Sequence, residues 1–250
     1  KNKPRREIAP AEYVSRRREL SAFMDEGSIA IVPGANPKIR NGDVQYPFRQ
    51  DSDFRYLTGF DEPNAVFVLI PGREHGETLL FCRERDNEHE RWHGHVTGPE
   101  LAMQLFGMDD AFPVSDIDDI LPGLIEGRSK LYYAMGVDRD FDHQVIEWVK
   151  KISQSDHLGA ESPGEFVQLD HYLHELRLFK SAAEIALMKL AADATVKGHC
   201  RIMQKTQPGM MEYELEAELI HEFSINGARY CAYPAIVGGG ANACVLHYVS

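Results

Sequence analysis

The sequence predicts an α/β domain followed by the beginning of an α+β domain, and three observations support this. Short β-branched or aromatic runs alternate with helical periodicity up to residue 152. Residues 153–164 are rich in Ser, Asp, Gly, Glu and Pro, a composition typical of a linker. After this stretch the pattern changes to two long helices and two strand-like segments. We therefore expect one domain at residues 1–170 and a second at residues 171–250.

The elements of the first domain follow from periodicity and from the residues that bound each segment. Helices are expected where apolar residues recur every three or four positions, and strands where short apolar runs lie between Gly, Pro or Asn. The expected helices are 11–24, 98–106, 115–125 and 141–152. The expected strands are 28–32, 54–60, 65–70, 78–82 and 130–135. This alternation is typical of a layered α/β domain.

The second domain is expected to open with a long helix, because Ser181 and Glu184 form a Ser-x-x-Glu capping box. Pro208-Gly209 ends this helix, and a second helix begins at about Met211.

Two strands, 233–237 and 244–249, are expected after these helices, joined by a turn that contains Gly238, Gly239 and Gly240. A dinucleotide site is less favoured than a hairpin turn, because such a site needs a helix after the glycines. Two helices and one hairpin leave apolar faces uncovered, so we expect the chain to continue beyond residue 250.

Composition excludes several classes of protein. The chain is 43% hydrophobic and 26% charged, which differs from disordered, collagen-like and disulfide-scaffold proteins. No apolar run approaches the roughly 20 residues that span a bilayer, so we expect no membrane partner. The net charge of −12 repels phosphate backbones, so nucleic acid is not an expected partner. The first residues include no apolar segment of a signal peptide, and we expect a cytoplasmic protein.

Several conspicuous clusters are interpreted as structural. Cys82, Cys200, Cys231 and Cys244 form no Cys-x-x-Cys pair and are expected to be buried free thiols. The basic run 16–18 is expected on a solvated helix face.

Two further clusters have spacings that a metal ion could use. The acidic residues between 109 and 119 lack EF-hand spacing and are expected to serve surface and capping roles. His89, His93 and His95 could bind zinc, but no second ligand group accompanies them, and a solvated loop is the favoured interpretation.

His247 is the most conspicuous single residue. Strand alternation would place Val245, His247 and Val249 on one face. Such a histidine is either a structural residue with apolar neighbours or a catalytic one, and the pattern leaves both interpretations open.

Four ordered segments resemble aminopeptidase P, the Xaa-Pro aminopeptidases of the pita-bread metallohydrolase superfamily. Segment 236–248, IVGGGANACVLHY, resembles the family pattern I-V-G-x-G-x-N-x-x-x-L-H-Y. Segment 48–60, FRQDSDFRYLTGF, resembles F-R-Q-x-S-D-F-x-Y-x-T-G-F. Segment 174–185 resembles H-E-x-R-L-F-K-S followed by E-I. The likeness continues at Pro208-Gly209-Met210 and at Gly227-Ala228-Arg229-Tyr230.

This resemblance implies a creatinase-like amino-terminal domain, a mixed sheet with flanking helices, followed by the opening of a pita-bread domain. It also implies release of the residue that precedes proline, with two divalent metal ions, usually manganese, activating a bridging hydroxide. The family's metal ligands lie downstream of its Leu-His-Tyr motif, so none is assigned here. We therefore expect the 250-residue chain alone to be inactive.

The resemblance also assigns three site residues. His247 would be catalytic, because it would hydrogen-bond the substrate near the scissile bond and stabilise the oxyanion. Tyr233 and Trp92 would be substrate-binding: the tyrosine lies near the metal centre in the family, and the tryptophan reaches a neighbouring subunit's site in tetrameric members. Both could instead be packing residues.

The family uses an arginine in the loop corresponding to residues 153–157, where this sequence has none. A homo-oligomer, dimer or tetramer, is expected.

Two alternatives remain. A prolidase-like enzyme would share the metal chemistry but prefer dipeptides, which a substrate-length series would reveal. A non-catalytic oligomerisation or binding module would bind a partner without metal.

Overall fold

The structure is a computed structural model that describes residues 7–155 and 159–249. The chain divides into two compact units, Ile8–Phe179 and the residues from Lys180 onward, called here the first and second units. We expected a boundary at residue 170, but helix α7 (Asp170–Leu178) packs against α1 (Pro10–Phe23) and belongs to the first unit. The units therefore divide after Phe179.

Six strands form one mixed sheet in the first unit. They are β1 Ile29–Pro33, β4 Val66–Leu69, β5 Thr78–Cys82, β6 Asp110–Pro113, β7 Lys130–Tyr133 and β8 Glu165–Gln168. Their spatial order is β6-β5-β4-β1-β7-β8. β4 is antiparallel to both β1 and β5, whereas β1–β7, β7–β8 and β5–β6 are parallel pairs. The segment expected to be a linker thus leads into a further strand of the same sheet.

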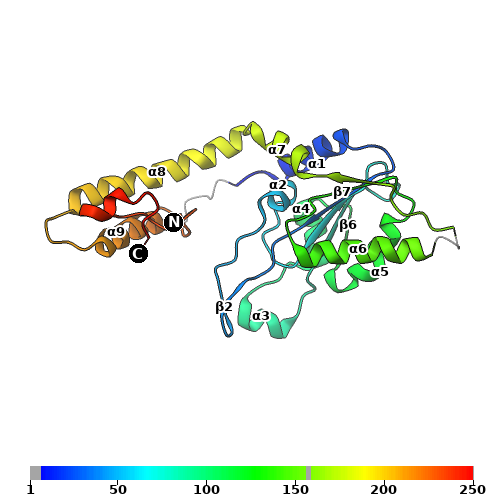
Figure 1. Ribbon diagram of the computed structural model, residues 1–250, viewed down its shortest axis with the longest axis horizontal. Coiled ribbons are helices and arrows are strands. Elements are labelled where there is room, and N and C mark those ends of the chain that lie inside the picture. The colour runs from blue at the N-terminus through cyan, green and yellow to red at the C-terminus, as the bar shows by residue number, and fades with distance from the viewer. Residues whose placement is uncertain (1–6, 156–158, 250) are drawn as a thin grey trace. The chain divides into compact units, whose positions relative to one another are not determined.

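Helices cover both faces of this sheet (Figure 1). One core forms against α1, α2 (Ser52–Thr58), α4 (Pro99–Phe106) and α7, and the other against α5 (Ile117–Ile125) and α6 (Arg139–Gln154). Strand β1 contributes side chains to both cores, because successive side chains of a strand point to opposite faces of the sheet. Ala30 and Val32 enter the first core, while Ile29 and Ile31 enter the second. The expected mixed sheet with flanking helices is confirmed.

The first unit also contains elements that we did not expect. The hairpin of β2 (Ile39–Asn41) and β3 (Val44–Gln45) forms a separate two-stranded sheet. The short helix α3 (Asn87–His93) occupies the histidine-rich segment expected to be a loop, and the 3-10 turn η1 (Val114–Asp116) precedes α5.

The strand expected at 54–60 is wrong, because this segment forms helix α2. Asp51 accepts hydrogen bonds from the amides of Asp53 and Phe54 and so caps the amino terminus of α2, and Gly59 ends the helix with φ +69°. Phe54, Leu57 and Thr58 are buried at helical spacing. The aromatic content suggested a strand, but the capping residues at both ends indicate the helix.

Arg16 and Arg17 are buried, so the expected solvated face is wrong for both. The Arg17 guanidinium donates to the carbonyl of Leu57 at 3.0 Å and to those of Phe106 and Gly107 at 3.1 and 2.7 Å. Leu57 and Phe106 lie in the last turns of α2 and α4, whose carbonyls lack partners within the helix and carry partial negative charge. Burial lowers the pKa of Arg17 to about 10, so it stays charged at neutral pH and binds both helix ends.

The second unit contains two packed helices, α8 (Ala182–Lys205) and α9 (Glu212–Ile225), and the 3-10 turn η3 (Gly240–Cys244). The capping box of Ser181 and Glu184 is confirmed. Gly198 permits the close approach of the helices, because a Cβ there would lie 2.6 Å from the Phe223 ring.

No strand forms among the described residues of the second unit, so the strands expected at 233–237 and 244–249 are wrong. Extended backbone becomes a strand only beside a hydrogen-bonded neighbour, and residues 180–249 supply none. Apolar residues of α8, such as Met188, Val196 and Met203, remain exposed in this chain.

The four cysteines are free, but only one is buried. Burial raises the pKa of Cys82 to about 12, whereas Cys200, Cys231 and Cys244 are exposed. The expectation of buried thiols is therefore wrong for three of them, because the second unit has little core. Among the residues that the structure describes, no helix has the length and apolar character needed to cross a bilayer.

We predict that Arg17→Met lowers the free energy of unfolding of the first unit by about 2–4 kcal/mol, because it leaves buried helix-end carbonyls without a donor. Denaturant unfolding followed by the fluorescence of Trp148, which is 3% exposed, measures this loss. Arg18→Met is the matched control, since Arg18 is exposed, and its effect should stay within about 0.5 kcal/mol. Equal effects of the two substitutions would contradict the capping role.

Candidate functional site

The glycine-rich loop, residues 238–248, carries His247 in the second unit. Its backbone turns tightly: the amide of Asn242 donates to the Gly239 carbonyl at 3.1 Å, and the amide of Val245 to the Asn242 carbonyl at 3.0 Å. Gly238 has no room for a side chain, because a Cβ would lie 3.0 Å from the backbone of Asn242 and Ala243. Gly240 has φ +55°, which favours glycine.

The side chain of Glu212 holds this loop. Glu212 is the first residue of α9, and its Oε1 accepts hydrogen bonds from the Gly239 amide at 2.6 Å and the Asn242 Nδ2 at 3.0 Å. Its Oε2 accepts from the Tyr248 hydroxyl at 2.9 Å. Asn242 Nδ2 also donates to the Tyr248 hydroxyl at 3.0 Å. One carboxylate thus connects the start, middle and end of the loop.

These hydrogen bonds shift the ionisation of the groups involved. The Gly239 amide, together with Asn242 and Tyr248, lowers the pKa of Glu212, and the bond to Glu212 raises the pKa of Tyr248. A carboxyl with a lowered pKa stabilises the folded state at neutral pH and loses this contribution as the pH falls through the lowered value. At neutral pH the loop is therefore anchored by an ionised carboxylate and a neutral phenol.

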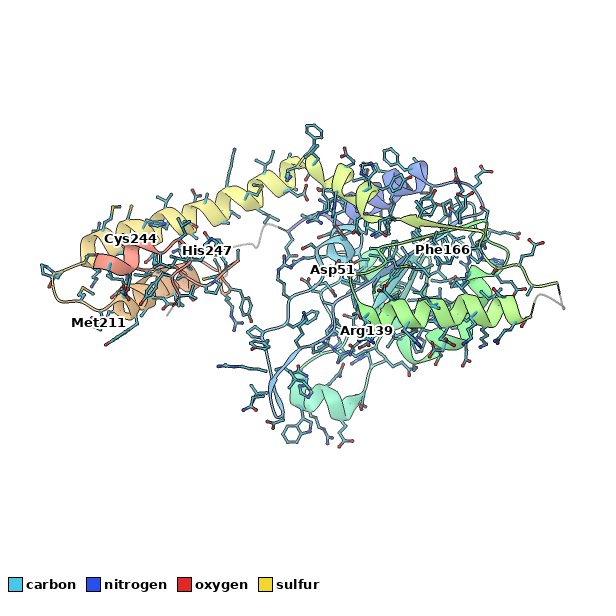
Figure 2. All side chains as sticks on the ribbon, viewed as in Figure 1. Asp51, Arg139, Phe166, Met211, Cys244 and His247 are labelled. Carbon is cyan, nitrogen blue, oxygen red and sulfur yellow. The ribbon has the colours of Figure 1, made fainter. Side chains whose placement is uncertain are left out.

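His247 lies in a turn of this loop, and its side chain is exposed. The expected strand face shared with Val245 and Val249 is absent, and Val245 is 53% exposed. Figure 2 shows His247 and Cys244 on the loop, with Met211 at the start of α9 in the same unit. The imidazole is thus presented on an anchored turn and is not buried in a core.

The other two predicted site residues are also exposed. Tyr233, in the second unit, is 70% exposed, and Trp92, on α3 of the first unit, is 81% exposed. The carboxylate of Glu90 accepts a hydrogen bond from the Val96 amide and binds Arg85, and its pKa falls to about 2, mainly through Arg85. Helix α3 therefore holds Trp92 on an ordered support with its indole free for a partner.

The conspicuous segment 48–60 has a structural role. The side chain of Gln50 is buried, accepts from the amides of Ala35 and Asp51, and donates to the Glu62 carbonyl.

Two other side chains of this segment hold α7 in the first unit. Asp53 forms an ion pair with Arg177, and the Tyr56 hydroxyl donates to the Leu176 carbonyl at 3.1 Å. These bonds link α2 to α7 within the first unit.

The acidic cluster has structural roles, but the expected capping is not found: Asp116, at the N-cap position of α5, makes no side-chain capping bond. Asp109 accepts from the Thr78 amide and hydroxyl at 2.9 and 2.7 Å, and Asp118 accepts from Trp148 Nε1 at 2.8 Å. In the histidine cluster, His95 contacts Glu90, and the side chain of His89 is not among the described groups.

The described residues do not provide a metal centre. No group of three or more His, Cys, Asp or Glu side chains converges among them. The loop in which the family resemblance calls for an arginine is described only as far as Ser155, and residues 156–158 lie outside the described part.

Both units match known families. Residues 13–133 match the family model "Aminopeptidase P, N-terminal domain", and residues 186–250 match "Metallopeptidase family M24". The chain therefore combines an aminopeptidase P amino-terminal domain with part of an M24 metallopeptidase domain, which confirms the resemblance drawn from the motifs.

Individual relatives extend this match over nearly the whole chain. The Xaa-Pro aminopeptidase of Escherichia coli K12 is 40% identical over 97% of this chain, and that of Haemophilus influenzae is 37% identical over 95%. The solved structure of Pseudomonas aeruginosa aminopeptidase PepP is 54% identical with a TM-score of 0.95. The solved structure of zinc-substituted E. coli aminopeptidase P in complex with product is 40% identical in sequence, with a TM-score of 0.94. This chain spans 53–56% of the length of these four proteins.

The sequence motifs select His247 but not Glu212. The bond to Gly239 joins residues far apart in sequence, so only a folded structure reveals it.

We predict that Gly238→Ala loosens the glycine-rich loop whereas Gly239→Ala leaves it intact. A Cβ at 238 would press on backbone at 3.0 Å, but one at 239 would lie 3.6 Å from Glu212, an ordinary contact. Native-state chymotrypsin cleavage after Leu246 or Tyr248 should accelerate about fivefold in Gly238→Ala, which corresponds to about 1 kcal/mol of local stability. Indistinguishable cleavage of the two variants would argue against the tight turn.

Proposed function

We propose that the full-length protein containing this chain is a metal-dependent Xaa-Pro aminopeptidase, which releases the amino-terminal residue from peptides with proline in the second position. The observation that carries the proposal is the collinear match of both units to aminopeptidases P, at 54% identity and a TM-score of 0.95 for the P. aeruginosa enzyme. The chain spans about half of such proteins, so the activity is proposed for the longer protein.

In this proposal His247 contacts the substrate next to the scissile bond. Its imidazole is exposed on an anchored loop, and it can donate a hydrogen bond to the oxygen on which negative charge develops. A donor fixed before the reaction stabilises the tetrahedral state without reorganisation. Tyr233, exposed in the same unit, is proposed to line the substrate site.

The metal ions are proposed to be divalent, with manganese as the physiological metal. They would supply a nucleophilic hydroxide and a Lewis acid when bound. The residues described here do not form their site, and we place the ligands in the remainder of the longer protein.

Chelation provides the direct test of this proposal. We expect exhaustive chelation to abolish cleavage of Xaa-Pro tripeptides and longer peptides by the full-length protein, and Mn²⁺ to restore it, because the hydroxide needs a metal to form at neutral pH. The free amino acid released is measured by mass spectrometry. Unchanged cleavage after chelation would refute the proposal, and cleavage confined to Xaa-Pro dipeptides would favour a prolidase.

The protein is further proposed to be a cytoplasmic homo-oligomer in which Trp92 reaches the substrate site of a neighbouring subunit. An indole that is 81% exposed on a short ordered helix is suited to such a contact.

Co-expression of two variants with lowered activity tests this contact. We expect Trp92→Ala and His247→Ala each to lower activity, and mixed oligomers of the two to regain part of it, because some sites then combine an intact His247 with an intact Trp92 from a neighbour. Peptide cleavage by co-purified, differently tagged subunits is the measurement. Mixed oligomers no more active than the separate variants would show that Trp92 does not act across subunits.

A further inference from the structure

We propose that Glu212 is the positioning residue for His247: its carboxylate fixes the glycine-rich loop and thereby sets where the imidazole is held. This inference rests on the proposed function for its catalytic consequence. Its structural basis is the set of bonds that Glu212 makes to Gly239, Asn242 and Tyr248.

The anchor points lie on both sides of the histidine. Asn242 precedes His247 in the loop and Tyr248 follows it directly, and both side chains converge on the same carboxylate. His247 is exposed, so its position depends on the backbone that carries it. Fixing the residues on either side removes most of the freedom of that backbone.

The base of this anchor is rigid. Glu212 is the first residue of the fourteen-residue helix α9, which packs against α8 through Leu219 and Phe223 near Gly198. Met211, directly before Glu212, donates its amide to the Glu214 carboxylate at 2.7 Å, which fixes the start of the helix. The loop is therefore attached to one of the two packed helices of the second unit.

The chemistry requires a carboxylate in particular. All three partners direct N–H or O–H donors at Glu212, and an ionised carboxylate is an acceptor at both oxygens. Glutamine has the same shape but keeps only one acceptor oxygen and carries no charge, so it would bind the three donors less strongly. Glu212 forms no ion pair with the described residues, so a general surface-charge role does not account for it.

Hydrogen exchange of the full-length protein tests the anchor without reference to catalysis. We expect exchange of peptides covering residues 238–248 to accelerate about fivefold or more in Glu212→Gln, because one of the two acceptor oxygens and the negative charge that strengthens the bond to the Gly239 amide are lost. Glu216→Gln on the same helix is the matched control, since no bond of Glu216 to the described residues is found, and its exchange should equal that of the wild type. Unchanged exchange in Glu212→Gln would overturn the inference.

A double-mutant cycle tests whether Glu212 acts through His247. In the wild-type background Glu212→Gln should lower kcat/KM by about 10- to 100-fold, since a small displacement of a catalytic group has effects of this size. In the His247→Ala background the same change should lower it less than about threefold, because there is no imidazole left to position.

The outcomes separate the two proposals. A wild-type protein that does not cleave Xaa-Pro peptides would refute the proposed function. If the wild type is active, two results would refute the positioning role alone. One is equal activity of the wild type and Glu212→Gln. The other is an equal effect of Glu212→Gln on kcat/KM in the wild-type and His247→Ala backgrounds. Two controls exclude a general loss of structure. Glu216→Gln should have the kinetics of the wild type, and circular dichroism should show that Glu212→Gln is folded.

Discussion

Strand β1 is the element on which the first unit depends, because it joins the β6-β5-β4 half of the described sheet to the parallel pair β7–β8. It pairs antiparallel with β4 and parallel with β7, and residues 29–32 are at most 4% exposed. A strand covered on both faces must be apolar throughout, and Ile29-Ala30-Ile31-Val32 satisfies this condition. A polar residue there would have to enter one of the two helix-covered cores. The two cores therefore depend on four consecutive side chains.

The architecture of the first unit was predictable where periodicity and turn residues agreed. The strand at 78–82 is found with the expected bounds, and the helix at 141–152 is longer by two residues at each end. The segment 54–60 forms helix α2 and not the expected strand, because the capping residues Asp51 and Gly59 outweigh its aromatic content. Burial of Arg17 could not be read from the sequence, because its three carbonyl partners come from α2 and from the end of α4, far along the chain.

The candidate site was predictable only through local sequence. The resemblance selected His247, Tyr233 and Trp92, and the structure places all three at exposed positions. Its geometry was not predictable, because the loop is formed by bonds to Glu212 on a different element. The strands expected at 233–237 and 244–249 are absent for a related physical reason. A strand forms only beside a hydrogen-bonded neighbour, whereas periodicity describes one segment at a time.

The distribution of thiols determines how this chain would respond to sulfhydryl reagents. Cys82 is the only cysteine of the first unit, and its burial and raised pKa make it a poor nucleophile. The exposed cysteines, at 200, 231 and 244, all belong to the second unit. A maleimide dye or spin label added to the native chain would therefore mark the second unit alone. At Cys244 it would sit three residues before His247, so spectroscopic probes of that loop need no engineered attachment point.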